Sequence, residues 1–80
     1  MTRQQEFDQL RQERSATLAT FITVAHQTER QMQNLHLPIG TDEDREVLSQ
    51  QRSELDACYI YLMASRKLTD FVRQQLELIH

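Results

Sequence analysis

The chain has 80 residues with nine basic and twelve acidic side chains, which give a net charge of −3 at pH 7. This length allows one small domain, and dispersed basic residues in an acidic chain argue against a nucleic acid as the main partner. The single cysteine excludes an internal disulfide and, with no apolar export segment near Met1, predicts a cytoplasmic location. The longest uncharged stretch, residues 15–28, is too short and too polar to span a bilayer, so we expect no membrane insertion.

The first predicted element is an amphipathic helix over about residues 3–36. Thr2 stands three residues before Gln5, a spacing that favours a helix N-terminus. Pro38 disfavours helical backbone at Leu37, so we expect the helix to end just before that residue. Apolar side chains recur at intervals of three and four residues or their sums, which is the helical period. The side that we expect to pack against a second helix carries Phe7, Leu10, Leu18, Phe21, Ala25 and Met32.

A break at residues 37–41 separates this helix from the next, because the only proline and the only glycine of the chain lie there. Thr41 followed by Asp44 resembles a capping box, which predicts that a second helix covers about residues 42–79. At about 1.5 Å per residue the two helices would be roughly 50 and 57 Å long, and so short a connection makes them antiparallel neighbours. We therefore predict an all-α fold, in which residues 1–80 form a single helical-hairpin domain with coiled-coil-like packing.

The second helix is apolar over more than the one stripe that a hairpin can bury, because residues 57–64 are eight consecutive apolar or aromatic positions. A helix that is apolar nearly all round is normally covered on more than one side. We expect the side that faces the first helix to carry Leu55, Tyr59, Leu62 and Val72. The partner-binding side is then formed by Ala57, Ile60, Tyr61, Ala64, Leu68 and Phe71. The opposing hypothesis is that residues 57–64 belong to the core of the hairpin alone.

The residue types that carry chemistry are scattered, and we predict no catalytic residue, no metal site and no cofactor. His26 and Glu29 share a helix face, but a di-metal bundle needs further glutamates on facing helices. Cys58 has no histidine within a turn, so we interpret it as a small buried apolar residue. Asp42 and the two acids that follow favour a helix start, because they lie at the positive end of the helix dipole. An enzyme is the last of the functions that we consider.

The segment Arg45-Glu-Val-Leu-Ser-Gln-Gln-Arg-Ser-Glu-Leu55 is a polar lead-in to the apolar residues 57–64. With eleven glutamines and two helices around one turn, the chain resembles the small co-chaperones of bacterial type III secretion needle subunits, the YscE-type family. The resemblance implies a helical hairpin that pairs with a larger tetratricopeptide-like chaperone. In that family the pair keeps an aggregation-prone secreted subunit monomeric before export.

Two classes of function follow from these patterns. The first is a co-chaperone or adaptor, a protein-binding module that docks its second helix on a helical partner. The alternative is a homodimer that forms a four-helix bundle, in a regulatory or phage-encoded protein. An RNA-binding dimer comes third, because the acidic charge disfavours it. The expected partner is accordingly another protein or a second copy of the chain, and no nucleic acid.

Overall fold

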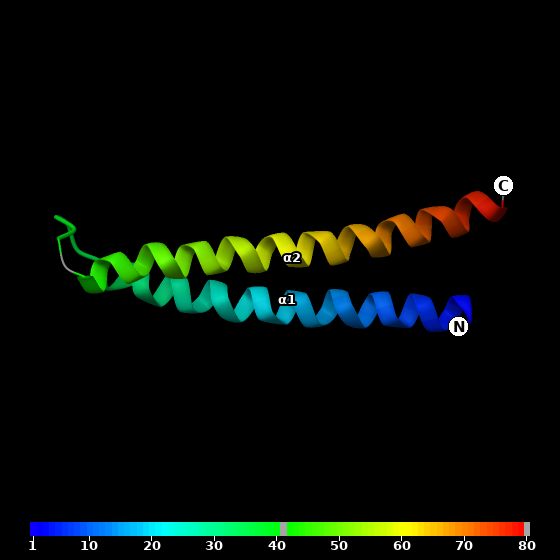
Figure 1. Ribbon diagram of the computed structural model, residues 1–80, viewed down its shortest axis with the longest axis horizontal. Coiled ribbons are helices and arrows are strands. Elements are labelled where there is room, and N and C mark those ends of the chain that lie inside the picture. The colour runs from blue at the N-terminus through cyan, green and yellow to red at the C-terminus, as the bar shows by residue number, and fades with distance from the viewer. Residues whose placement is uncertain (41, 80) are drawn as a thin grey trace.

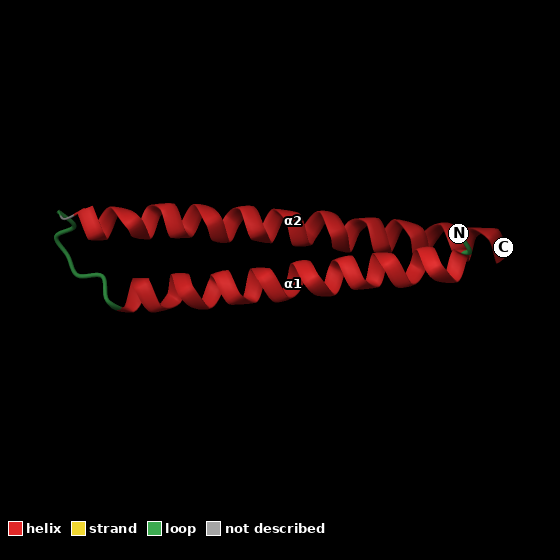
Figure 2. Ribbon diagram, turned by 60° about the horizontal axis from the view of Figure 1, so that its bottom comes forward, coloured by secondary structure: helices red, strands yellow, loops and turns green. Residues whose placement is uncertain are grey.

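Two long helices joined by one connection make up the fold (Figure 1). The structure is a computed structural model that describes residues 1–40 and 42–79, with the side chain of Glu43 excepted. Helix α1 covers Arg3–Gln33 and helix α2 covers Asp42–Ile79. The helices lie side by side and antiparallel in a rod of 59 × 19 × 15 Å (Figure 2). The prediction of an all-α helical hairpin is thereby confirmed.

The N-terminus of α1 is fixed by two hydrogen bonds between Thr2 and Gln5. The Thr2 hydroxyl accepts a bond from the Gln5 N–H at 3.1 Å, and Gln5 Oε1 accepts one from the Thr2 N–H at 2.9 Å. Both bonds satisfy backbone donors that have no partner within the helix. The spacing of these two residues in the sequence predicts the start of the helix correctly.

Replacing Thr2 by alanine is expected to lower the free energy of unfolding by about 1 kcal/mol, because the cap is lost. Thr23→Ala is the matched control, since Thr23 lies inside α1 and its hydroxyl donates to the Ala19 carbonyl at 3.0 Å. That change should leave the stability unchanged or raise it slightly, because alanine has the higher helix propensity. Thermal melts followed by circular dichroism measure both variants. Equal effects of the two changes would contradict the role of the cap.

Helix α1 ends at Gln33, earlier than the position near residue 36 that Pro38 predicts. The N–H groups of Asn34 and Leu35 each bond to the carbonyl three residues back, both at 3.2 Å. Such bonds belong to a 3₁₀ turn, and they close the helix before the steric effect of the proline is reached. The predicted boundary is therefore a few residues too late.

The start of α2 is held by Asp44, which accepts a hydrogen bond from the backbone N–H of Gly40 at 3.3 Å. The predicted bond between Asp44 and Thr41 falls on a residue outside the described part of the chain. Gly40 does not have a positive φ, and a Cβ at this position would meet no atom within 4 Å. A side chain at residue 40 would therefore be tolerated, unlike one at a glycine that a left-handed turn requires.

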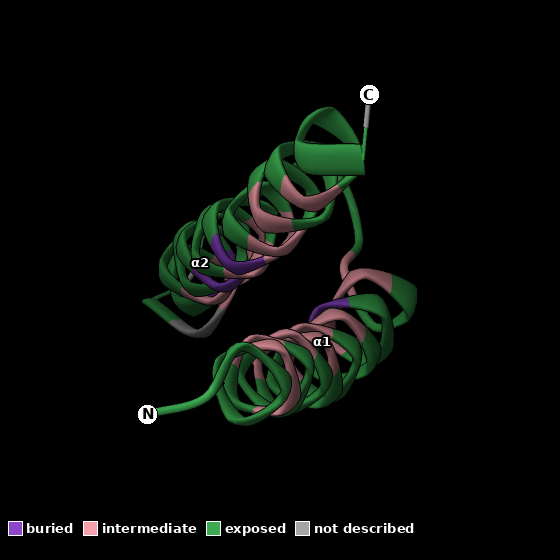
Figure 3. Ribbon diagram, turned by 90° about the vertical axis from the view of Figure 1, so that its right-hand side faces the viewer, coloured by how far each residue is buried: buried purple, intermediate pink, exposed green. Residues whose placement is uncertain are grey.

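The core is a thin strip between the two helices, and the outer surfaces of both are exposed (Figure 3). Among the described residues, the buried side chains are Thr28, Val47, Ala57 and Ala64. A hairpin has a single contact surface, so each helix covers the other on one side only. Most of the apolar surface of α2 therefore lies outside this strip.

Candidate protein-binding face

The contact between α1 and α2, which we call the seam, follows a seven-residue repeat of buried and half-buried positions. In α1 these positions are Phe7, Arg14, Phe21, Thr28 and Leu35, with Leu10, Thr17, Val24 and Gln31 beside them. In α2 they are Val47, Glu54, Tyr61, Leu68 and Gln75, with Gln50, Ala57, Ala64 and Phe71 beside them. Two such rows in each helix are the packing pattern of a coiled coil.

Arg14 places a charge in the seam, and α2 supplies its partners. Arg14 Nη2 donates to Tyr61 Oη at 3.0 Å, and Arg14 Nε donates to Ser65 Oγ at 3.3 Å. The guanidinium carbon lies 5.4 Å from the centroid of the Tyr61 ring, which is a cation–π geometry. A half-buried arginine without such partners would destabilise the hairpin. Arg14 therefore favours contact with the side of α2 that carries Tyr61 and Ser65.

Thr28 is a second polar residue of α1 with a hydrogen-bond partner in α2, nearer the turn. Its side chain is 5% exposed, and its hydroxyl donates to the Val24 carbonyl at 3.0 Å. Gln50 Nε2 of α2 donates to the Thr28 hydroxyl at 3.4 Å and to the Val24 carbonyl at 3.3 Å. These polar groups are paired across the seam, so burying them does not carry the cost of an unmade hydrogen bond.

Aromatic pairs and small residues complete the seam. Phe7 stacks on Phe71 with ring centroids 6.1 Å apart, and Phe21 stacks on Tyr61 at 6.2 Å. Between the stacks lies Ala64, which is only 2% exposed. A small side chain here leaves room for the larger residues of α1, so that large and small residues alternate across the contact.

This seam reverses the two sides that the sequence analysis assigns to α2. The residues expected to face α1 are exposed, namely Leu55, Tyr59, Leu62 and Val72. Five residues expected to bind a partner pack against α1 instead, namely Ala57, Tyr61, Ala64, Leu68 and Phe71. The sixth, Ile60, is exposed beside the seam. The physical reason is the polar content of α1, because Arg14 and Thr28 need hydrogen-bond partners that a row of leucines does not offer.

The expected residues of α1 lie where the sequence places them, on the side toward α2. Each is half-buried in the hairpin, and the set comprises Phe7, Leu10, Leu18, Phe21, Ala25 and Met32. Leu18, Ala25 and Met32 form the flank of the seam, whereas Arg14 and Thr28 take central positions that the apolar pattern skips. The apolar pattern of α1 thus does not include the polar residues at the centre of the side that faces α2.

With the seam on its other side, α2 leaves a row of leucines in solvent. This leucine row has a seven-residue spacing and comprises Leu48, Leu55, Leu62, Thr69 and Leu76. The exposed fractions of its four leucines run from 54 to 68%. Val72 and Ile79 are also exposed and lie three residues after Thr69 and Leu76. The spacing is that of a second coiled-coil contact, next to the seam on the same helix.

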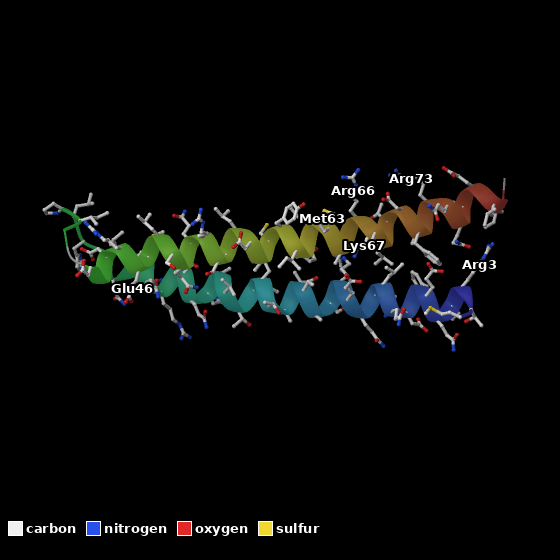
Figure 4. The ribbon with its side chains drawn as sticks, viewed as in Figure 1. Arg3, Glu46, Met63, Arg66, Lys67 and Arg73 are labelled. Atoms are coloured by element: carbon white, nitrogen blue, oxygen red, sulfur yellow. The ribbon has the colours of Figure 1, made fainter. Side chains whose placement is uncertain are left out.

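A row of arginines runs along the edge of the leucine row that is farther from α1. It has the same spacing and comprises Arg45, Arg52, Arg66 and Arg73, with Tyr59 at the remaining position. Within residues 1–40 and 42–79, none of these four exposed guanidinium groups has a hydrogen bond or an ion pair. Figure 4 shows Arg66 and Arg73 pointing away from α1. The arginine row would complement carboxylates on a molecule that covers the leucines.

Helix α1 adds apolar residues to the same face. The flank residues Leu18 and Met32 belong to the same seven-residue row of α1 as Gln4, so all three lie on one side of the helix. A hollow near the chain ends is lined by Gln4 together with Val72, Leu76 and Ile79 of α2. The flank of α1 and the leucine side of α2 therefore lie next to each other. We call this combined surface the leucine face, and it comprises Leu18, Ile22 and Met32 of α1 with the leucine row, Val72 and Ile79 of α2.

The opposite face of the hairpin carries isolated apolar residues among polar ones. Lys67 pairs with Glu13 across this face at 3.3 Å. Ile60 shares the seven-residue row of Lys67, and its neighbours in that row are Ser53 and Lys67. A hollow beside Ile60 is lined mainly by small residues of both helices, among them Ala16, Thr20 and Ser53. An apolar residue that stands alone in its row does not form a contact stripe.

Comparisons with known proteins give no family for this chain. No protein-family model, no curated protein and no solved structure matches it. The resemblance to needle-subunit co-chaperones thus stays a prediction. In the described residues, no helix combines the length and apolar character of a membrane span, and no three His, Cys, Asp or Glu side chains gather as a metal ion would need.

Proposed function

We propose that this chain is a non-enzymatic protein-binding module, a co-chaperone or adaptor that docks its leucine face on a helical segment of another protein. The observation that carries the proposal is the leucine row, whose four leucines are each more than half exposed. In the isolated hairpin their outer surfaces contribute little to stability. Burial by a partner of the part of one leucine that is still exposed would contribute roughly 1–2 kcal/mol.

The chemistry of the face describes the partner. A helix with apolar side chains every three or four residues fits a row of this spacing, and carboxylates along one edge would meet the arginine row. The resemblance to the YscE-type family would make the partners a tetratricopeptide-like chaperone and a secreted subunit. The single cysteine, Cys58, agrees with assembly of such a complex in the cytoplasm.

Leu62 and Ile60 provide a matched pair of variants for the test. Both side chains are 56% exposed, but they lie on opposite faces of the hairpin. Tagged wild-type chain, Leu62→Asp and Ile60→Asp would each be used to capture proteins from cells that express the chain naturally. We expect Leu62→Asp to lose the captured partner and Ile60→Asp to retain it, because each change adds the same charge at an equally exposed position.

Circular dichroism on the same samples controls for folding, and both variants should keep the helical signal of the wild type. Capture of the same proteins by wild type and Leu62→Asp would contradict the proposal. Loss of the partner in Ile60→Asp alone would place the binding surface on the opposite face and would contradict it as well.

A further inference from the structure

We infer that a second copy of this chain covers the leucine face when no other partner is bound. The two copies pack face to face around a twofold axis parallel to the helices, so that α2 of each copy lies on α1 of the other. The result is a four-helix bundle with both leucine rows inside. The inference rests on the proposed function only in its use of the leucine face, and self-association and partner binding are mutually exclusive on it.

The hairpin exposes more surface than a globular monomer of its mass. Its accessible surface is 6642 Å², whereas a globular monomer of 9.5 kDa exposes about 5,000 Å². The excess of roughly 1,600 Å² is about twice the 800 Å² that each partner contributes to an interface of standard size. The leucine face runs along most of a molecule 59 Å long, so one face-to-face contact can bury an area of that order.

The charges at the edge of the leucine face distinguish two ways of packing two identical faces. A twofold axis that runs across the helices places α2 on α2 of the second copy. The arginine row then lies along the arginine row of the other copy whatever the register, because each row borders the leucines on the outer edge. Like charges along a whole edge oppose association. This arrangement is therefore disfavoured.

A twofold axis parallel to the helices instead places α2 on α1 of the second copy. Such an axis leaves the level of every residue along the rod unchanged, so α2 meets the other α1 at the levels where it meets its own. Phe7 stacks on Phe71, so Asp8 is level with residue 70, between Arg66 and Arg73. Asp8 pairs with Arg11 of its own helix at 3.9 Å, and Arg11 lies in the same seven-residue row as Leu18. At this end of the rod each copy therefore brings one acidic and one basic side chain, already paired, to the arginines of the other.

The end of the rod near the turn differs, because Glu29 has no ion pair within the described residues. Gln50 bonds to Thr28, so Glu29 is level with about residue 49, between Arg45 and Arg52. Glu29 and Asp8 share one seven-residue row of α1, which also contains Ile22 and borders the flank of the seam. Both carboxylates of each copy thus border the outer edge of its leucine face, facing the arginine rows of the second copy. Charge therefore favours the axis parallel to the helices, and Glu29, which has no ion pair of its own among the described residues, makes the larger contribution.

Sedimentation equilibrium of the full chain over a wide concentration range tests whether a second copy covers the leucine face. We expect the mass to rise from one chain to two with increasing concentration. Leu62→Asp should weaken this association by about 100-fold or more, because both copies lose a buried leucine and gain a buried charge. Ile60→Asp should dimerise as the wild type does. A wild-type chain that stays monomeric at every concentration, or a dimer that Leu62→Asp does not weaken, would overturn the inference.

Disulfide cross-linking tests the arrangement in a Cys58→Ser background. Leu62 of one copy lies within about one residue of the level of Ser15 of the other if the axis is parallel to the helices, and Ser15 is in the row of Ile22. A mixture of Leu62→Cys and Ser15→Cys chains should therefore form the mixed disulfide. Disulfides between two Leu62→Cys chains only would overturn this arrangement. These experiments distinguish the inference from the proposed function. If the chain stays monomeric but its capture of another protein still depends on Leu62, the inference of a second copy is wrong and the proposed function stands.

Discussion

Replacing Ala64 with aspartate is expected to unfold the hairpin, while the same replacement at the neighbouring Met63 leaves it folded. Ala64 is 2% exposed and faces α1, whereas Met63 is 40% exposed. A carboxylate at residue 64 would be buried against apolar neighbours without a partner, which costs about 3–5 kcal/mol. A loss of this size is comparable to the whole stability of a small domain. At residue 63 the carboxylate remains in water.

Far-UV circular dichroism and urea unfolding of the two variants measure the difference. We expect Ala64→Asp to lose most of the helical signal at 25 °C and Met63→Asp to unfold at nearly the urea concentration of the wild type. A folded Ala64→Asp chain would contradict the position of the seam. So would a Met63→Asp chain that unfolds as readily as Ala64→Asp.

The second large effect is expected at Phe71, where alanine should lower the free energy of unfolding by about 2–3 kcal/mol. The change removes the ring that stacks on Phe7 at 6.1 Å. We expect a smaller loss of stability than is usual for a Phe→Ala change in a core, because Phe71 is only half-buried. Leu62→Ala is the control. It should change the stability of the monomer little, since Leu62 is 56% exposed.

Urea titrations at concentrations where the chain is monomeric compare these two variants. Dilution matters because Leu62→Ala also weakens any association through the leucine face. The order of the two effects separates the two possible seams. A larger loss of stability for Leu62→Ala than for Phe71→Ala would mean that the leucine row packs against α1. That result would contradict the position of the seam.

The hairpin itself could be predicted because its signals are local. Pro38 and Gly40 mark the only break, and Thr2 with Gln5 marks the first helix start. Uninterrupted apolar periodicity on either side of the break predicts the two helices. The predicted end of α1 is less accurate. The helix is closed by 3₁₀ bonds of Asn34 and Leu35, and these bonds depend on local geometry that no particular residue type indicates.

The side of α2 that faces α1 could not be predicted from hydrophobicity. The leucine row is the more apolar of the two candidate stripes, and hydrophobicity alone therefore places it in the seam. The seam is decided by residues that a search for apolar periodicity skips. Arg14 requires the hydroxyl groups of Tyr61 and Ser65, and Thr28 pairs with Gln50. Hydrogen bonds between two helices become visible only when both helices are placed.

One signal in the sequence indicates which stripe of α2 is left exposed as part of the leucine face. Written in rows of seven residues, α2 separates into a mixed polar and apolar row through Tyr61, a leucine row and an arginine row. A mixed row matches an α1 whose own central row contains Arg14 and Thr28. The leucine row, which is apolar except for Thr69 and is bordered by arginines, is then left exposed and available for a second coiled-coil contact.

The leucine row is exposed in the hairpin, and the proposed function requires that it is covered when the protein binds. The most direct measurement is the rate at which a thiol reagent labels Leu62→Cys, in a Cys58→Ser chain, with Ile60→Cys as the matched position. In the dilute hairpin both thiols should react rapidly. When the chain dimerises or a partner is added, labelling of Leu62→Cys should slow strongly and that of Ile60→Cys should not change. Slow labelling of Leu62→Cys in the dilute hairpin, or protection of Ile60→Cys in its place, would contradict the account.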